Sequence, residues 1–295
     1  MERAAEQQTM WRPSLASTRR APDRIYHYTD AAGLLGIIQT KTIWATDLAF
    51  LNDSREFVHA VGLVSRLVEE LVRKTPAEEM QVRLASMALA DATENVRMSF
   101  RVNVACYCSA ADLLSQWRGY GAGLGYALGF DSASLRAALE PSLDLPLAPV
   151  VYDVEEQLEA LRPIAGPVLK YFIDNAGQVP SASQDSFLSA YLPFLGVCFQ
   201  FKDPAFMEEQ EWRSCNVRMV RPNGETRFRA SQSGVIPHEA LDLGNGGENI
   251  ASLREVIVGP GRNIELRRQA IEMLMRHHGY EGVDVRVSAV PFREP

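Results

Sequence analysis

The sequence predicts a single α+β domain. Short segments that alternate apolar and polar residues, as strands do, are interspersed with amphipathic helical segments. These segments lack the steady strand–helix–strand repeat of a doubly wound sheet, and no internal repeat or long interior linker divides the chain. We therefore expect one domain over 23–295, after a disordered leader over 1–22 that is polar and has little hydrophobic periodicity.

The composition is that of an ordinary globular protein and excludes several classes. The chain has 295 residues, of which 46% are hydrophobic, and a formal net charge of -7, which argues against nonspecific coating of nucleic acid or anionic membrane. Four scattered cysteines do not form a disulfide framework, and the sequence contains neither an apolar signal segment nor a stretch of membrane-spanning length. We expect a reducing, cytoplasmic location and no membrane partner.

The first third of the folded chain predicts two strands, a short helix and a helical hairpin. The first strand begins with RIYHYTD at 24–30, and Thr29 or Asp30 caps a helix over 31–40. A short strand over 42–46 follows. The hairpin comprises a helix over 53–74, which Asn52, Asp53 or Ser54 caps, and a second helix that starts at Pro76.

The remaining two thirds predict short strands mixed with helices. Strands are expected over 101–110, 125–131, 148–154, 209–220, 255–258 and 282–290. Helices are expected over 131–140, near 155–176, near 184–200 and over 264–278.

His27 is the first residue that invites a functional interpretation. Strand alternation places it on one face with Ile25 and Thr29, whereas Tyr26 and Tyr28 point to the other. A histidine on a half-buried strand is either an ordinary core histidine or a group that contacts a ligand. The local sequence leaves both interpretations open.

The glycine-rich stretch RGYGAGLGYALGFD at 118–131 does not fit a dinucleotide fingerprint. Such a fingerprint needs its glycines after a strand and before a helix, and here they precede a strand. GPG at 259–261 has the right order but lacks the Lys-Ser/Thr of a phosphate-binding loop, so we expect a plain turn. Trp117, Arg118 and Tyr120 lie beside the glycines, where they either contact a ligand or wedge the loop against the core.

Two acids near 210 form the strongest candidate for chemistry. If a strand begins at Glu209, then Glu209, Glu211 and Arg213 share one face. Carboxylates at i and i+2 repel each other unless a cation or a substrate hydroxyl lies between them. The alternative is a solvated edge strand in which Arg213 neutralises one acid.

Other candidate motifs are weaker. Asn52 and Asp53 are candidates for bracing a site, although Asp53 with Glu56 also has the spacing of a capping box. The sequence contains no nucleophile elbow and no HExxH frame, and its potential metal-ligand clusters are weak. We expect no metal site.

Six sequence blocks, taken in order, carry a resemblance. They are YHYTDAAGLLGII, IWATDLAFLNDSREF, LLSQWRGYGAGLGYALGFD, FKDPAFMEEQEWR, REVIVGPG and VSAVPFRE. Together they cover about residues 24–293 and resemble a family of uncharacterised bacterial proteins defined as a domain of unknown function. The set is more distantly similar to the ADP-ribosyltransferase superfamily, in which matching positions are His27 and Thr29 in the first block, Tyr120 or Tyr126 in the middle, and Glu209 with Glu211 in the last.

The resemblance implies a curved, split-sheet α+β core, with the helical hairpin as an insertion, that grips NAD. It implies cleavage of the nicotinamide–ribose bond, either hydrolytic or with transfer of ADP-ribose to an unknown protein or nucleic-acid acceptor. Glu211 would stabilise the positive charge that develops on the ribose, and Glu209 would orient or deprotonate the acceptor. The expected NAD-binding residues are His27, Tyr28, Thr29, Asn52, Asp53, Trp117, Arg118 and Tyr120.

Two further functions remain open at this point. A metal-dependent nuclease or phosphoesterase would combine acids such as Asp53 and Glu56 with the two acids near 210 and Lys202. The order Glu-x-Glu-Trp-Arg does not match the usual acid-x-lysine core of such enzymes. A non-catalytic sensor would hold a nucleotide with the aromatic and arginine side chains at 117–120.

Overall fold

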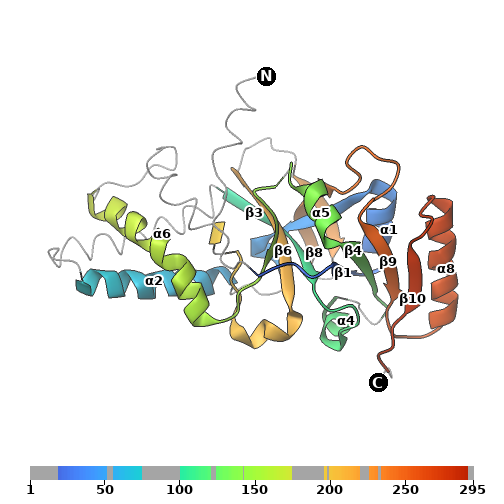
Figure 1. The fold of residues 1–295 in the computed structure, drawn as a ribbon, viewed down its shortest axis with the longest axis horizontal. Helices are drawn as coiled ribbons and strands as arrows, with labels where there is room; N and C mark the ends of the chain where they lie inside the picture. The colour runs from blue at the N-terminus through green and yellow to red at the C-terminus, as the bar shows by residue number, and fades with distance from the viewer. Residues whose placement is uncertain are drawn as a thin grey trace, which may run out of the picture.

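The computed structural model describes residues 19–51, 56–74, 100–120, 124–141, 143–174, 196–197, 199–219, 226–231 and 234–291. Within these ranges the fold is α+β, as the sequence predicts: helices surround one ten-stranded sheet (Figure 1). The main path of the sheet runs β10-β9-β4-β1-β3-β2-β8-β7, and β6 and β5 branch from β3. The β9–β10 pair is parallel, and the other pairs among the described strands are antiparallel.

The first elements form as the local sequence predicts. β1 (Arg24–Thr29) leads into α1 (Ala31–Thr40), whose first turn is capped by Asp30: its carboxylate accepts a hydrogen bond of 2.8 Å from the Gly33 amide. Lys41 adopts a left-handed conformation and ends α1. β2 (Thr42–Asp47) and the 3-10 turn η3 (Leu48–Phe50) follow.

β3 (Phe100–Cys108) is the strand at which the sheet divides. One edge pairs along its whole length with β6 (Glu211–Met219), which in turn pairs with β5 (Leu145–Pro149). The opposite edge is shared, because β2 pairs with it at Asn103 and Val104 and β1 pairs with it at Cys108. The stretch between these contacts, 105–107, is where β1 and β2 part.

Two branches extend from this division. On one side β1 pairs with β4 (Tyr126–Asp131), then β9 (Leu253–Val258) and β10 (Asp284–Val287), and α8 (Ile264–His277) connects the last two strands. On the other side β2 pairs with β8 (Gly234–Asp242), which forms a hairpin with β7 (Arg227–Ser231). The sequence did not predict this hairpin. α4 (Leu114–Tyr120) and α5 (Ser132–Leu139) lie beside the sheet.

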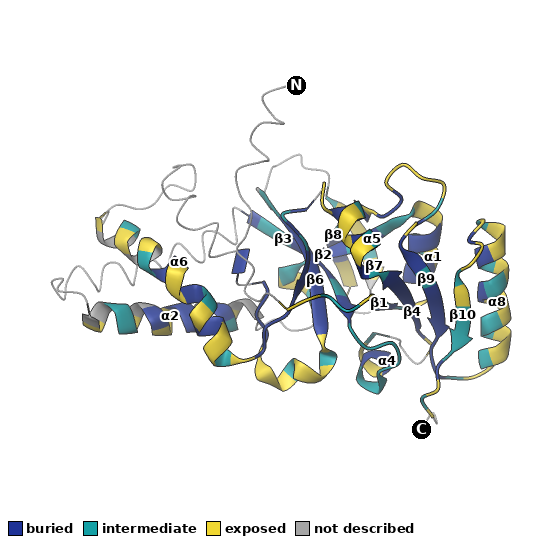
Figure 2. Ribbon diagram, in the orientation of Figure 1, coloured by how far each residue is buried: buried dark blue, intermediate teal, exposed yellow. Residues whose placement is uncertain are grey.

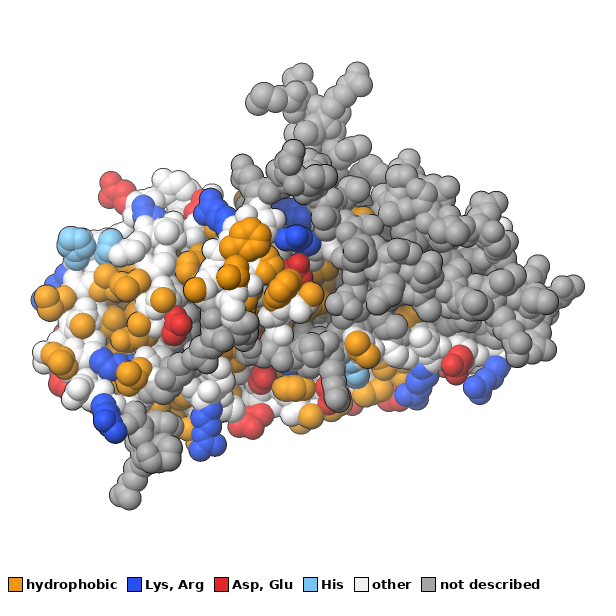
Figure 3. Space-filling model, turned by 180° about the vertical axis from the view of Figure 1, so that it is seen from behind, with side chains coloured by type: hydrophobic (Ala, Val, Ile, Leu, Met, Phe, Trp, Pro, Cys, Tyr) orange, Lys and Arg blue, Asp and Glu red, His pale blue; other side chains and the backbone are white. Residues whose placement is uncertain are grey.

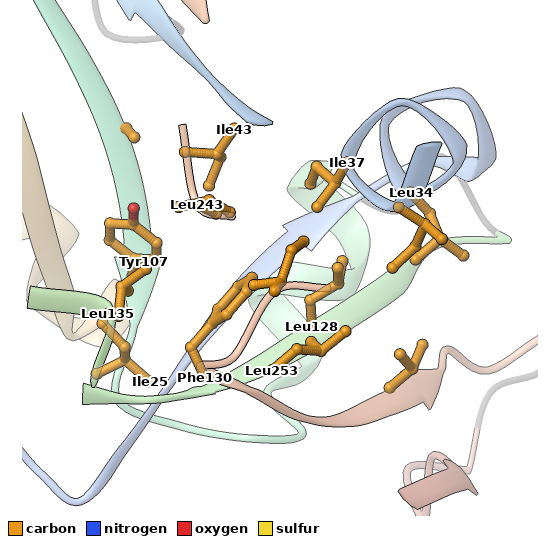
Figure 4. Close-up of a cluster of buried hydrophobic side chains, with 14 of the residues drawn as sticks. Ile25, Leu34, Ile37, Ile43, Tyr107, Leu128, Phe130, Leu135, Leu243 and Leu253 are labelled. Carbon is orange, nitrogen blue, oxygen red and sulfur yellow. The ribbon is translucent and has the colours of Figure 1, made fainter. Parts of the chain in front are cut away.

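The main core lies between α1 and the branch of the sheet that contains β1, β4 and β9. Leu34 and Ile37 of α1 point toward Ile25 of β1, Phe130 of β4 and Ile43 of β2 (Figure 4). Burial of these aliphatic and aromatic side chains is the main stabilising contribution to the fold. Figure 2 shows β4 and β9 buried along most of their length, whereas the outer face of α8 is exposed.

α2 (Glu56–Lys74) and α6 (Val154–Asp174) cross each other at one end of the molecule (Figure 1). His59 Nε2 lies 2.9 Å from Gln157 Oε1. The first helix of the predicted hairpin therefore packs against α6. The helix predicted after Pro76, and most of the one predicted near 184–200, lie outside the described residues.

Two strand boundaries differ from the prediction. The strand predicted over 148–154 is β5, which ends at Pro149, and Val151 forms only an isolated bridge with Phe201. The strand predicted from Glu209 begins at Glu211, because Glu209 ends the 3-10 helix η4 (Pro204–Glu209) and Gln210 is left-handed with a φ of 47°. The expected alternation of Glu209 and Glu211 on one strand is therefore wrong.

Candidate functional site

Four charged residues, Lys202, Glu209, Glu211 and Arg213, form a compact group that we call the Lys202 cluster. Lys202 Nζ lies 2.7 Å from Glu209 Oε2 and 3.0 Å from Glu211 Oε2. Arg213 Nε and one of its terminal nitrogens donate to the two Glu211 oxygens at 2.8 and 3.0 Å. A cation therefore separates the two acids, which is one of the arrangements that their spacing requires.

The chain around Lys202 holds the cluster in place. The backbone of Lys202 donates to the Val151 carbonyl, and its own carbonyl accepts from Gln157 Nε2 at 2.9 Å. Asp203 then caps η4 by accepting from the Ala205 amide. The left-handed Gln210 reverses the chain into β6, which brings Glu209 and Glu211 to the same ammonium group.

The two carboxylates have opposite pKa shifts. Burial alone would raise the pKa of Glu211, but the charges of Arg213 and Lys202 and their hydrogen bonds lower it to about 2. Burial raises the pKa of Glu209, and Lys202 only partly offsets that rise. The Glu209 side chain is 21% exposed, compared with 5% for Glu211. Glu211 is thus a fixed anion, and Glu209 is the more accessible acid.

Tyr120 is the predicted middle aromatic that lies near this cluster. Burial raises the pKa of its hydroxyl, and the charges of Cys106, Glu209 and Glu211 raise it further, so the phenol stays protonated. It is carried by α4, which packs against η4. Tyr120 is therefore positioned beside the acids as a neutral aromatic group.

His27 lies where the sheet divides. Its Nδ1 is 2.9 Å from the Cys106 carbonyl oxygen, and because a carbonyl only accepts, Nδ1 carries the proton. Burial lowers the pKa of His27, the Cys106 hydrogen bond opposes this, and the charge of Arg229 lowers it further. A neutral His27 therefore leaves Nε2 as a hydrogen-bond acceptor.

His27 and Glu211 approach each other through Cys106. The register places Tyr26, Cys108 and Glu211 on one face of the sheet, whereas His27 points to the other face, where its ring meets Tyr107. The Cys106 carbonyl bonds His27, and the Cys106 side chain hydrogen-bonds the Glu211 carboxylate. One residue of β3 thus contacts both predicted site residues.

Tyr28 and Trp117 already use their polar atoms inside the fold. The Tyr28 hydroxyl donates to the Ala110 carbonyl and accepts from the Leu113 amide. Trp117 is 3% exposed, and its Nε1 donates to Asp112 at 2.6 Å. The two rings meet edge to face, with centroids 4.7 Å apart. These side chains wedge α4 against β1, which is the structural interpretation that the sequence left open for Trp117.

The other predicted site residues are dispersed. Thr29 is half-buried beneath α1, where a Cβ at Gly33 would lie 2.0 Å from its Oγ1, so only glycine fits there. Arg118 is exposed. Asn52 and Asp53 lie outside the described residues. Within the ranges that the structure describes, no group of three His, Cys, Asp or Glu side chains is placed to hold a metal ion.

Sequence reasoning missed a second polar group on β2, β8 and β7. An Arg229 terminal nitrogen donates to Thr46 Oγ1 at 3.1 Å, and the guanidinium lies 5.7 Å from the centre of the Trp44 ring. His238 packs against Trp44, with ring centroids 5.1 Å apart. Thr46 and His238 are directly paired across β2 and β8. These residues come together only through the β7–β8 hairpin, which the sequence did not predict. No local sequence motif therefore indicates the group.

On the face shown in Figure 3, Lys and Arg side chains of the described residues are interspersed with acidic and apolar side chains. No described helix is both long and apolar enough to cross a membrane.

Comparison with known proteins identifies one similarity. Residues 116–214 match the model of a family described as "Protein of unknown function (DUF2971)". This supports the resemblance to an uncharacterised family, although over a shorter range than the sequence blocks suggested. The matched segment runs from α4 to β6 and includes Tyr120 and the Lys202 cluster, but not His27. No curated protein and no solved structure matches the chain.

Proposed function

We propose that this chain is an NAD-dependent ADP-ribosyltransferase-like protein that cleaves the nicotinamide–ribose bond and passes ADP-ribose to a protein or nucleic-acid acceptor, or to water. The observation that supports this most directly is the convergence of His27 and Glu211 on Cys106, where β1 and β2 part. Cys106 thus links a neutral imidazole on one face of the sheet to an ionised carboxylate on the other, although His27 and Glu211 come from distant parts of the sequence.

The charge state of Glu211 fits this chemistry. Departure of nicotinamide leaves positive charge on the ribose, and a carboxylate that is already ionised stabilises that charge in the transition state. With its pKa lowered to about 2, Glu211 is ionised at neutral pH. His27 Nε2 would accept a hydrogen bond from a ribose hydroxyl, and Tyr120 would contact the ligand through its ring.

Lys202 has a specific part in this proposal. Lys202 bonds Glu209 and Glu211 at the same time, so Glu211 Oε2 already has a hydrogen-bond partner. A bound ribose hydroxyl would replace Lys202 on Glu211, and Lys202 would remain paired with Glu209. Glu209, which is partly exposed, would then orient or deprotonate the acceptor.

A second candidate is a non-catalytic NAD-binding module. Three N–H donors from Lys202 and Arg213, together with the Cys106 side chain, already bond the Glu211 carboxylate. A carboxylate has about four acceptor positions, so this one is close to saturated. If Lys202 does not yield to the ribose, the site binds NAD without cleaving it.

The deciding experiment measures NAD binding by calorimetry and nicotinamide release by chromatography on the same preparation. The wild type should bind NAD and release nicotinamide, and Glu209→Gln should slow transfer to an acceptor while NAD is still bound. Glu208→Gln, at an exposed neighbour in η4, is the matched control and should behave as the wild type. Binding without release supports the second candidate. If the folded wild type neither binds nor consumes NAD, both the transferase proposal and the binding-module alternative are contradicted.

A further inference from the structure

We infer that Arg229, Thr46 and His238 form a binding site for a phosphate group. The three residues come from adjacent strands, β7, β2 and β8, and strand alternation puts them on the same face of the sheet. Thr46 and His238 form a directly opposed pair, and Arg229 reaches across β8 to bond Thr46. The site is separate from the Lys202 cluster.

Two buried nitrogens in this group have no hydrogen-bond partner among the described residues. They are Nε of Arg229 and Nδ1 of His238. His238 is 6% exposed; burial lowers the pKa of its ring and a hydrogen bond with the Ile236 backbone raises it, so Arg229 Nε is the clearer of the two unpartnered donors. Leaving a buried donor unsatisfied costs about 1–3 kcal/mol, and more for a charged group, so such atoms in a native protein call for a ligand or a bound ion.

The chemistry of these groups selects an oxyanion. Nε and the terminal nitrogen of a guanidinium donate side by side, which matches two oxygens of a phosphate. The Thr46 hydroxyl and a protonated Nδ1 of His238 add two neutral donors. The Trp44 ring beneath the guanidinium holds it in position by stacking.

The local charge is unbalanced in the direction that a phosphate would correct. Arg229 forms no ion pair with a carboxylate within the described part of the chain; the acid that acts on it electrostatically is Asp30, whose Oδ1 is already bonded to the Gly33 amide. Arg227 adds a second positive charge on the same face, and the charge of Arg229 lowers the pKa of His27 as well. In a chain of net charge -7, this is a local positive site.

The phosphate group could belong to either of two ligands, a free phosphate ion or the diphosphate of a nucleotide. The nucleotide source rests on the proposed function, since NAD carries a diphosphate, whereas the site itself does not. Inorganic phosphate, pyrophosphate and ADP-ribose, each titrated calorimetrically at constant ionic strength, distinguish these sources. Pyrophosphate and ADP-ribose should bind more tightly than phosphate if the ligand is a nucleotide. Equal affinities for phosphate and pyrophosphate indicate the free ion.

Arg229→Gln is the decisive variant, and Arg227→Gln, on the same strand and face but exposed, is its matched control. We expect Arg229→Gln to weaken binding of the tightest of the three probes by at least about tenfold, which is the lower end of a charged hydrogen bond converted to affinity. Arg227→Gln should change it by less than about threefold, as expected of a rim charge. Circular dichroism melts check that both variants fold.

Three results overturn the inference: no saturable binding of any probe to the wild type, an unchanged affinity in Arg229→Gln, or equal losses in both variants. Glu209→Gln separates the two proposals. If it retains phosphate binding and NAD is not consumed by the wild type, the phosphate site stands and the transferase proposal fails.

Discussion

The Lys202 ammonium lies 3.0 Å from the Glu211 carboxylate, and each of the two side chains is only 5% exposed. A buried ion pair of this kind contributes little net stability by itself, because desolvation offsets the attraction between the charges. Loss of one partner is different, since the other charge is then left buried and uncompensated. The Lys202 cluster is therefore a place where single substitutions have large effects on the fold as well as on any chemistry.

Lys202→Met should lower the free energy of unfolding by about 3–5 kcal/mol, the range for breaking a buried pair. Urea denaturation measures this. Lys170→Met is the control, because Lys170 and Asp174 also form an ion pair, at 2.8 Å, but both are largely exposed. That variant should lose less than about 1 kcal/mol. Equal losses in the two variants would contradict a special role for the buried cluster.

The same reasoning changes the design of a Glu211 variant. Glu211→Gln leaves Lys202 and Arg213 buried beside a neutral amide, so we expect it to unfold more easily than the wild type. Loss of activity in that variant would not separate chemistry from folding. Glu209→Gln is a better test of the chemistry. Glu209 is more exposed, and among the ion pairs described it pairs only with Lys202.

Stability should fall in acid because of Glu211. Its pKa is about 2 in the folded protein and about 4.5 in the unfolded chain, so the unfolded chain binds a proton first as the pH drops. The stability that this residue contributes is fully present above about pH 4.5 and is lost as the pH falls toward 2. The difference corresponds to about 3 kcal/mol. Denaturation of the wild type across pH 2–6 tests it, and a flat profile below pH 4.5 would contradict it.

Two histidines should cause a second loss of stability, at a higher pH than the loss caused by Glu211. Burial lowers the pKa of both His27 and His238, and the charge of Arg229 lowers both further. In the unfolded chain they take up protons below their ordinary pKa of 6.5, so folding is progressively disfavoured as the pH falls below that value. The double variant His27→Gln/His238→Gln should show a smaller slope of stability against pH between 7.5 and 5.5. Identical slopes would rule out this account.

Gly259→Ala tests the packing beneath Trp117. A Cβ at this position would lie 2.7 Å from the Gly125 carbonyl oxygen and 2.8 Å from the Trp117 ring, neither of which is free to move. Overpacking of this kind should destabilise the protein by about 1–3 kcal/mol, measured by urea denaturation. Gly62→Ala in α2 is the opposite case, because nothing lies within 4 Å, and it should stabilise by about 0.5–1 kcal/mol.

Elements specified by neighbouring residues were predictable from the sequence. Asp30 caps α1, and Leu34 and Ile38 lie in its buried stripe, so two local signals agree. The same holds for α5, which Asp131 caps through the Ser134 amide. In both cases the decisive contacts lie within four residues along the chain.

The site was less predictable because its geometry depends on distant contacts. The left-handed conformation of Gln210 ends the strand that the sequence predicted from Glu209. Glycine is the residue that usually adopts this conformation, so a glutamine at this position gave no signal of the break. β8 contains Pro237, a residue that is uncommon inside a strand. Pairing with β2 ends at His238, so β8 at Pro237 extends beyond β2 and pairs there with β7. Arg229 and His238 were missed for that reason.

The long pairing of β3 with β6 has a consequence for how the protein is made. β3 must wait for β6, which lies about one hundred residues later in the sequence, before its longest ladder can form. A chain emerging from the ribosome therefore carries β1, β2 and β3 for seconds before Glu211 and Arg213 are synthesised. Over that interval the nascent chain lacks Glu211 and Arg213, so the Lys202 cluster cannot assemble until synthesis has passed β6.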